Sequence, residues 1–337
     1  MKIRFPSILL LACVPMLSAA ADLAVYAIDV EGGKSTLFVS PSGESMLVDT
    51  GYDGFKGRDA DRIVAAARAA GVKQIDYLVI THYHRDHVGG VPQLAAKMPI
   101  RNFVDHGTNF ERAKDNAAVY EAYLKARKKG NHIVVKAGDR IPIQGIQVDV
   151  VTASGVGIAQ PLPGAGQPNP ACASYHPLAV DTGENAHSIG MVITYGSFRL
   201  VDLGDLYWNQ EHDLACPANK LGVVDVYLST HHGKKTSGSP QMVWALHPKV
   251  AIMNNGPTTG GSAQAWQTIH DSPGLLDLWQ LHFATANGQA HNSPEAVIAN
   301  LAQDAESCQG NWIQLTATQD GAFTVQNGRT YFSKSYR

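Results

Sequence analysis

The sequence predicts an α/β fold in which strands and helices alternate in layers. Short runs rich in β-branched and aromatic residues, separated by glycine-containing turns, begin at residue 22. Between such runs, segments such as "RDADRIVAAARAAG" (58–71) repeat apolar residues at helical spacing and end on a glycine. The composition, 45% hydrophobic and 17% charged over 337 residues, is that of a globular protein with a substantial core.

The first elements follow one another closely. The runs "LAVYAIDV", "STLFVS" and "SMLVDTG" are expected to be strands, and the glycines and the Pro-Ser-Gly at 41–43 supply the turns between them. The helix at 58–71 comes next. A buried strand, "IDYLVI" (75–80), then precedes "GGVPQLAAK", which begins another helix. This strand–helix–strand order predicts a layered α/β core.

The second half of the chain repeats this alternation. A further helix is expected at 117–130, and strands at 132–136, 141–143 and 146–152. The segment 154–174 is rich in Gly, Pro, Ala and Gln and nearly free of charge, which predicts a long surface loop. Strands resume with "SIGMVITYG", "FRLVDLGD", "VVDVYLST" and "KVAIMNN", and "WIQLTATQDGAFTVQNG" ends as a hairpin. We expect residues 22–337 to form one domain of two similar α/β halves.

The N-terminus has the pattern of a secretory signal peptide. "MKIRFPSILLLACVPMLSAAAD" has a basic start, an apolar run and small residues before an expected cleavage between Ala21 and Asp22. The apolar run is shorter than the ~20 residues of a spanning helix, and no other stretch is long and apolar enough. We therefore expect residues 1–21 to be a leader and the mature chain to be periplasmic or secreted. "LLAC" resembles a bacterial lipoprotein cleavage box, so lipidation of Cys13 is the alternative.

Charge and cysteine content restrict the partners. Cleavage would remove two of the 27 basic residues and none of the 29 acidic ones, which leaves a net charge of −4. A non-specific nucleic-acid binder should be basic, so no stable nucleic-acid complex is expected. Three cysteines would remain, and Cys172–Cys216 is the pair we favour for a disulfide in an exported chain. Because the number of cysteines is odd, this pairing leaves Cys308 as a free thiol, and the sequence alone does not determine the disulfide pattern.

The stretch "THYHRDHVGG" (81–90) carries a dense cluster of metal-ligand side chains directly after the buried strand. They are His82, His84, Asp86 and His87. In an extended loop, residues two apart point the same way, so the first three could share one side while the fourth turns to a neighbouring position. Imidazole nitrogen and carboxylate oxygen at this density suit zinc, with manganese or iron as alternatives. A polar loop with incidental histidines is disfavoured by this spacing.

The same stretch closely resembles the H-x-H-x-D-H signature of the metallo-β-lactamase superfamily. The resemblance implies an αββα four-layer sandwich that usually carries two metals. "LVDTG" (47–51) is similar to the acidic turn before the metal loop, and implies that Asp49 supports a ligand histidine whose other N–H must be held. "FRLVDLGD" is similar to the strand that ends in a bridging aspartate, here Asp205. "DVYLSTHHGKKTSGS" supplies a late histidine after a strand.

More closely, four segments resemble the extracytoplasmic nuclease-like domain of the ComEC competence proteins. They are "IDVEGGKST", "IDYLVITHYHRDHVGG", "ENAHSIGMVITYGSFRLVDLGD" and "HHGKKTSGS", in that order. One departure is Gly-Gly-Lys at 32–34 in place of Gln-Gly-Asp, which is expected to put a lysine near the opening of the site. Another concerns the third histidine of the first metal site, which this branch often lacks. His187 could restore it, or could be an exposed loop residue.

The resemblance implies a ligand set for two divalent metal ions. His82, His84 and His187 would hold the first ion; Asp86, His87 and one of His231 or His232 would hold the second; Asp205 would bridge them. We prefer His231, the residue closest to the preceding strand end, and expect His232 to be a substrate contact or an alternate ligand.

Such a centre suits hydrolysis. Two metals about 3.5–4 Å apart can share a hydroxide, and an acidified water supplies a nucleophile at neutral pH. Asp86 would be the catalytic residue that both ligates a metal and orients this hydroxide. Lys234 and Lys235 could meet an anionic substrate group, or could form a solvated basic turn.

We therefore expect an exported dinuclear-metal hydrolase. The branch resemblance favours a phosphoester or phosphodiester, such as a nucleotide or nucleic acid, and the acidic charge favours a small molecule or an oligonucleotide over a long polyanion. A lactam or lactone hydrolase is the alternative. A non-catalytic metal-binding module is a second alternative, which the ligand set disfavours because a structural site closes at four ligands and needs no second metal.

Overall fold

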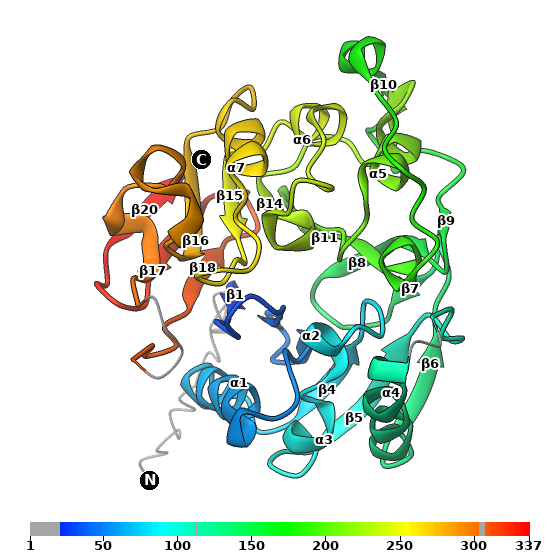
Figure 1. The fold of residues 1–337 in the computed structure, drawn as a ribbon, viewed down its shortest axis with the longest axis vertical. Coiled ribbons are helices and arrows are strands. Elements are labelled where there is room, and N and C mark those ends of the chain that lie inside the picture. The colour runs from blue at the N-terminus through cyan, green and yellow to red at the C-terminus, as the bar shows by residue number, and fades with distance from the viewer. Residues whose placement is uncertain (1–20, 112–113, 303–306) are drawn as a thin grey trace, which may run out of the picture.

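A computed structural model describes residues 21–111, 114–302 and 307–337. The expected leader, with Cys13, lies outside these residues except at Ala21. Two large sheets stand between two sets of helices, with α1 to α4 along one side of the molecule and α5 to α7 along the other (Figure 1). The first set is α1 (Arg58–Ala69), α2 (Arg85–Val88), α3 (Val91–Leu94) and α4 (Lys114–Arg127); the second is α5 (Trp208–Ala215), α6 (Pro240–Leu246) and α7 (Ala263–His270).

The first sheet has nine strands and contains both ends of the described chain. Its order is β20 (Ser333–Tyr336), β19 (Phe323–Asn327), β18 (Ile313–Ala317), β1 (Leu23–Ala27), β2 (Thr36–Val39), β3 (Ser45–Val48), β4 (Ile75–Val79), β5 (Ile100–Asp105) and β6 (Asn131–Val134). The pairs from β20 to β3 are antiparallel, whereas those from β3 to β6 are parallel. The carboxyl ends of β3, β4 and β5 therefore lie at one edge of this sheet.

The second sheet also combines antiparallel and parallel pairs. Its order is β17 (Ile298–Asn300), β16 (Asp277–His282), β15 (Val250–Met253), β14 (Val226–Leu228), β12 (Phe198–Asp202), β11 (Gly190–Tyr195), β8 (Gln147–Ala153) and β7 (Arg140–Ile141), and β9 (Val156–Gly157) pairs with β8. The pairs from β7 to β12 are antiparallel, and those from β12 to β17 are parallel. The two sheets thus repeat one pattern of pairing.

Three buried clusters hold the layers together. One contains inward-facing residues of both sheets, such as Val25 of β1 and Val150 of β8, and fills the space between them. A second joins the first sheet to helices, with Ile63 of α1 as an example. A third joins the second sheet to its helices, for instance through Met242 of α6 and Ile269 of α7. Alternate strand residues face opposite sides, so each sheet supplies two of these clusters. The predicted αββα sandwich is confirmed.

Most expected elements form with small shifts at their ends. The expected hairpin at the end of the chain is β18–β19, and a disulfide joins Cys172 to Cys216. The expected loop at 154–174 has more regular structure than predicted. It contains β9, a 3-10 turn and β10 (Gln167–Pro168), which pairs with β13 (Ala218–Asn219). No helix in the described ranges has the length and apolar character that crossing a bilayer requires. The 3-10 turns are η1 (Phe55–Gly57), η2 (Pro170–Ser174), η3 (Glu184–His187), η4 (Thr230–Gly233), η5 (Thr285–Asn287), η6 (Gln289–His291) and η7 (Glu295–Val297).

Candidate metal centre

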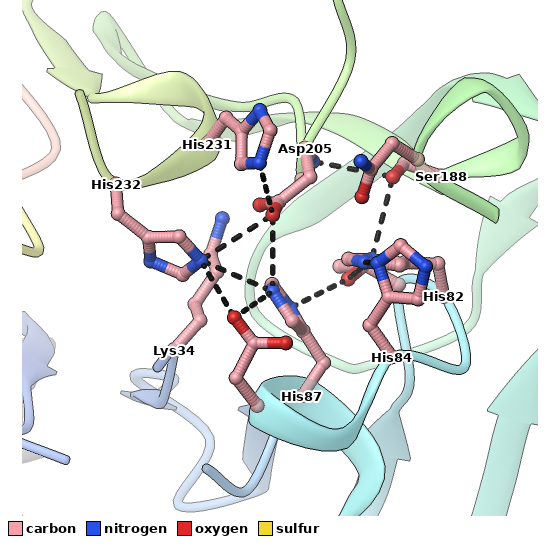
Figure 2. Close-up of polar contacts among 12 residues, drawn as sticks. Lys34, His82, His84, His87, Ser188, Asp205, His231 and His232 are labelled. Carbon is pink, nitrogen blue, oxygen red and sulfur yellow. Dashed lines mark hydrogen bonds and ion pairs between the residues drawn. The ribbon is translucent and has the colours of Figure 1, made fainter. Parts of the chain in front are cut away.

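The predicted ligands converge from loops that follow strands of both sheets. The "THYHRDHVGG" stretch begins just after β4, Asp205 follows β12, and the two late histidines follow β14. Figure 2 shows these side chains pointing toward one another across the space between the two sheets' loops. Ligand sites of open α/β sheets characteristically lie outside the carboxyl ends of strands, where loops can aim side chains at a common point.

His82 and His84 form the first pair of ligand atoms. Residues 81–84 are not helical, and His84 has extended backbone angles, so side chains two apart share a side. Nε2 of His82 lies 3.1 Å from Nδ1 of His84. Ligand atoms bound tetrahedrally at about 2.0–2.1 Å are about 3.3 Å apart, so one cation fits between these nitrogens.

Asp86, His87, Asp205 and His232 form a second group, in which one ligand atom of each lies within 4.8 Å of the others. Nε2 of His87 is 3.2 Å from Nε2 of His232. Oδ2 of Asp205 is 3.2 Å from the first nitrogen and 3.3 Å from the second. Oδ2 of Asp86 is 3.7 and 3.4 Å from the same two atoms. Asp86 and His87 reach this group because the chain turns into α2 at Arg85 instead of staying extended.

His232 and not His231 enters this second group, which reverses the preference drawn from the sequence. Both residues have left-handed backbone angles, with φ of 52° at His231 and 56° at His232. The resulting tight turn brings the later residue inward, and its carbonyl accepts a hydrogen bond from the Gly261 amide at 2.8 Å. A Cβ on Gly260 would lie 2.1 Å from this carbonyl oxygen, so the close approach requires glycine there.

His231 lies on the other side of Asp205, facing a cavity. Its Nε2 is 3.4 Å from Oδ2 of Asp205, its Nδ1 is 3.1 Å from Oγ of Ser237, and its ring stacks on Tyr207 at 5.2 Å. Burial lowers the pKa of His231 to about 3, so its imidazole is neutral at physiological pH.

Negative charge dominates the second group. Burial alone would lower the pKa of His87, but the carboxylates of Asp205, Asp49 and Asp86 together raise it well above its ordinary value. Burial would likewise raise the pKa of Asp205, but the surrounding imidazoles, His87 first, hold it well below its ordinary range. The carboxylates therefore attract positive charge into a site from which water is largely excluded.

The residues fit a pair of divalent cations. Imidazole nitrogens and carboxylate oxygens are the ligands that zinc and similar metals take in proteins. Oδ1 of Asp205 is buried and has no hydrogen-bond partner among the described residues. Because Oδ2 of the same carboxylate faces the second group, Oδ1 is free to face another cation. The arrangement is that of a cluster able to hold metal ions.

Hydrogen bonds from behind fix the orientation of the ligand rings. Oδ2 of Asp49 lies 2.7 Å from Nδ1 of His87 and accepts a hydrogen bond from Oγ1 of Thr81 at 2.7 Å. The structure thus gives Asp49 the contact that the sequence assigned to it. A ring nitrogen held in this way leaves the other nitrogen directed at the cation.

Two glutamates that sequence reasoning missed support the same loop. Oε2 of Glu111 lies 2.8 Å from Nε2 of His84. Glu184 is buried and accepts hydrogen bonds from the amides of Tyr83 at 3.0 Å and Phe110 at 2.6 Å. Its carboxylate also lies 3.1 Å from Nε2 of the buried His106. Nothing in the spacing of these acidic residues signalled such roles; for Glu184 the only signal was its place in the "ENAHS" segment.

His187 does not join the first pair of histidines. Its Nδ1 lies 2.8 Å from the carbonyl oxygen of Gly183, and its ring stacks on Phe110 at 3.8 Å. The neighbouring Ser188 contacts the back of the His82 ring, with Oγ 3.4 Å from Nδ1, while Nε2 of that ring faces His84 (Figure 2). The expected ligand role of His187 is therefore corrected, because the 3-10 turn that ends at this residue directs its ring away.

Lys34 does not stand at the opening of the site, where the sequence comparison had put it. Its side chain is 1% exposed and forms an ion pair with Asp202, which is fully buried at the end of β12. Its amide donates a hydrogen bond to the carbonyl of Asp86 at 3.1 Å. The lysine thus lies beneath the centre and joins the first loop of the chain to the strand that precedes Asp205.

A cavity of about 420 Å³ opens above the centre. Its lining includes the metal-ligand candidates His84, Asp86 and Asp205 together with His231, Tyr207, Asn185, Lys234, Lys235 and Thr236. The two lysines predicted to contact substrate therefore share a cavity with the candidate ligands. A small anion in this cavity would meet cationic side chains on one wall and the His/Asp cluster at its base.

The sequence model of the metallo-β-lactamase superfamily matches residues 28–176, a segment that includes the first three candidate histidines. This chain contains a metallo-β-lactamase superfamily domain. Its hydrolase-like fold and its His/Asp cluster agree with a superfamily whose members typically bind divalent metals. A solved structure of similar fold, the metallo-β-lactamase fold protein YhfI from Bacillus subtilis, is 12% identical, with a TM-score of 0.49, and the match covers 77% of this chain and 96% of that one.

Two curated proteins are similar to this chain at low identity. ComE operon protein 3 of Bacillus subtilis is 25% identical over 289 residues, which are 81% of this chain and 32% of the relative. Recombination protein 2 of Haemophilus influenzae is 24% identical over 233 residues, which are 69% of this chain and 24% of the relative. The chain thus spans about a third and about a quarter of the lengths of these relatives. The predicted similarity to ComEC-type proteins is confirmed.

Proposed function

We propose that this chain is an exported dinuclear-metal hydrolase of phosphoesters, with a phosphodiester of a nucleotide or short oligonucleotide as its substrate class. One observation carries the proposal: Oδ2 of Asp205 lies 3.2 and 3.3 Å from the ligand nitrogens of His87 and His232, while its other oxygen is buried and has no hydrogen-bond partner in the described part of the chain. A carboxylate in this position suits the bridge between two cations.

The chain offers ligands for both cations. His82 and His84 would hold one, and Asp86, His87 and His232 would hold the other, with Asp205 shared. Two divalent ions bound there would acidify a water and so supply a nucleophile at neutral pH. No serine or cysteine nucleophile is then needed.

The cavity side chains would bind and orient the substrate. Lys234 and Lys235 line the cavity and would hold a phosphate oxygen by charge. His231 presents a neutral imidazole to the same cavity and would hydrogen-bond a substrate oxygen. Asp86, whose side chain is 17% exposed, is the ligand carboxylate that would orient the attacking water.

Four observations support the substrate class and the location. The cavity volume of about 420 Å³ suits a small anion better than a long polymer, as does the acidic net charge. One curated relative is named Recombination protein 2, which supports a substrate derived from nucleic acid. The disulfide between Cys172 and Cys216 supports an oxidising, extracytoplasmic compartment.

The test is turnover of bis(p-nitrophenyl) phosphate by purified protein that has been stripped with a chelator and reloaded with zinc or manganese. We expect metal-dependent hydrolysis that is lost in His84→Ala and retained in His270→Ala, a surface histidine whose side chain is 56% exposed. Protein with two bound cations and no phosphodiester turnover would overturn the proposal. Cleavage of a chromogenic cephalosporin or a lactone, without phosphodiester turnover, would support the lactam or lactone alternative. Absence of turnover on all of these substrates would support a non-catalytic metal-binding module.

A further inference from the structure

A separate cluster of metal-ligand side chains lies where the loop after β1, the end of β16 and the segment before β18 meet. Its members are Asp29, Glu31, His282 and Cys308, and one ligand atom of each lies within 4.8 Å of the others. None of these residues belongs to the His/Asp centre described above. Asp29 and His282 are fully buried, and the side chain of Glu31 is 7% exposed.

The separations approach those of a four-coordinate zinc site. Sγ of Cys308 is 3.3 Å from Oδ2 of Asp29 and 4.0 Å from Nε2 of His282, and the latter nitrogen is 3.9 Å from Oε2 of Glu31. Ligands bound to zinc at about 2.0–2.3 Å are separated by about 3.3–3.8 Å. Oδ1 of Asp29 and Nε2 of His282 lie at hydrogen-bond distance (2.7 Å) and would have to move apart.

Arg62 of α1 holds both carboxylates from the side opposite the histidine. Its Nη1 lies 2.8 Å from Oδ2 of Asp29 and 3.1 Å from Oε1 of Glu31, which leaves Oε2 of the glutamate facing the histidine. Ligating carboxylates are commonly fixed by such outer hydrogen bonds. The charges also balance, because two carboxylates, one guanidinium and a thiolate sum to −2, which one divalent cation neutralises.

We propose that these four side chains form a structural site for one zinc-class cation, separate from the hydrolytic centre. Thiolate, imidazole and carboxylate groups all bind zinc, and a site closed by four protein ligands leaves no position for substrate, as in structural sites. The cation would fix the loop after β1 to the end of β16 and to the segment before β18. This loop also contacts the hydrolytic centre, because the Lys34 amide donates a hydrogen bond to the carbonyl of Asp86, but it contributes no ligand there.

A reactive thiol is the competing explanation for Cys308. Burial raises the pKa of this thiol to about 12, and the carboxylate of Asp29 adds to the effect. Reactive cysteines have lowered pKa values in electropositive surroundings, so these surroundings argue against a nucleophile or redox sensor. A bound cation would deprotonate the thiol and relieve the unfavourable charge.

The test uses cobalt as a spectroscopic substitute for zinc in the full, non-reduced chain. Only a thiolate ligand gives a near-ultraviolet sulfur-to-cobalt charge-transfer band. Cys172 and Cys216 are joined in a disulfide, so the band would report Cys308. We expect one cobalt more than the His/Asp centre binds, together with the band, and loss of both the extra equivalent and the band in Cys308→Ser. Any contribution of Cys13 is the same in both proteins and cancels in their difference spectrum.

His84→Ala is the matched control, because it alters the hydrolytic centre and leaves this cluster intact. It should lose phosphodiester turnover and keep the band, whereas Cys308→Ser should keep two cations and the turnover. Failure of the proposed function would therefore leave this test unaffected. Wild-type protein without the band, or Cys308→Ser with it, would overturn the proposal. Circular dichroism of each variant, with His282→Gln as a second variant of the cluster, separates loss of the site from loss of the fold.

Discussion

Nε2 of His87 lies 3.2 Å from Nε2 of His232, although 145 residues separate the two in the chain. Both side chains are fully buried. Two imidazole nitrogens at this distance can share only one proton, whereas one cation can accept both lone pairs. Oδ2 of Asp205 approaches both nitrogens, so the loops of the two sheets meet at one point that favours positive charge.

Replacing His232 with alanine should remove a ligand of the second cation. Because the ligand atoms of three other side chains would then face an incomplete site, we expect loss of about one metal equivalent and a fall in kcat/KM of more than the 10–100-fold that outer-shell changes produce. Elemental analysis of dialysed protein, combined with phosphodiester kinetics, measures both quantities.

His231→Ala provides the comparison, because this neighbour faces the cavity. We expect it to keep the full metal content and to lose activity through weaker contact with substrate. If the His231→Ala protein lost the metal and the His232→Ala protein kept it, the ligand assignment would be reversed.

Asp49→Ala should weaken metal binding without removing a ligand. The aspartate holds Nδ1 of His87 at 2.7 Å and so fixes the direction of Nε2. Loss of such a partner typically lowers metal affinity or activity 10–100-fold. Competition with a fluorescent chelator would measure this affinity.

Asp53→Asn is the matched control, since Asp53 pairs with Arg85 at the surface and touches no ligand ring. An affinity in Asp49→Ala equal to that in Asp53→Asn would show that the contact with His87 does not support the metal.

The fold was predictable because its elements carry strong local signals. The apolar run of β1 follows from burial on both faces of its sheet, and the helical spacing in α1 follows from burial on one face. The order of strands and helices then limits the possible layers. The ends of helices shifted by a few residues, since terminal turns depend on local contacts. The short elements inside 154–174 were not predicted, because a Gly- and Pro-rich segment has no periodicity.

The site was predictable where ligand spacing is local and less so where a turn decides direction. His82 and His84 come together because residues two apart on non-helical backbone share a side. Whether His231 or His232 enters the ligand group depends on the left-handed backbone angles of both residues and on the packing of His232 against Gly260. No pattern in the sequence predicts these angles. The ring of His187 is directed away from the centre by the 3-10 turn Glu184–His187, which the sequence pattern did not predict either.

Lys34→Met should destabilise the fold by breaking a buried ion pair. Asp202 would keep a buried charge without its partner, and removal of one partner of such a pair costs about 3–5 kcal/mol. Urea unfolding followed by far-ultraviolet circular dichroism, with chelator present so that metal binding does not enter, would measure the loss.

The double variant Lys34→Met/Asp202→Asn tests the cause. It removes the uncompensated charge and keeps the oxygen that accepts the amide of Gly204, so we expect most of the stability to return. A double variant as unstable as Lys34→Met would assign the loss to packing.

Glu211 should make stability fall as the pH rises. Burial raises the pKa of this carboxyl from 4.5 to about 7, although the amides of Ser239 and Gly238 donate hydrogen bonds to it. The folded protein therefore holds this proton more tightly than the unfolded chain does. Its contribution to stability is complete below pH 4.5, and is lost as the pH rises through about 7.

Glu211→Gln cannot titrate, so the free energy of unfolding of the wild type minus that of the variant isolates this effect. Two and a half pH units at 1.36 kcal/mol each predict that the difference falls by about 3 kcal/mol between pH values below 4.5 and above 7. Urea unfolding at a series of pH values measures it, with the exposed Glu121→Gln as the control. A difference that stays constant across this range, or that grows with pH, would mean that the folded protein does not retain this proton, because the hydrogen bonds from Gly238 and Ser239 then outweigh burial.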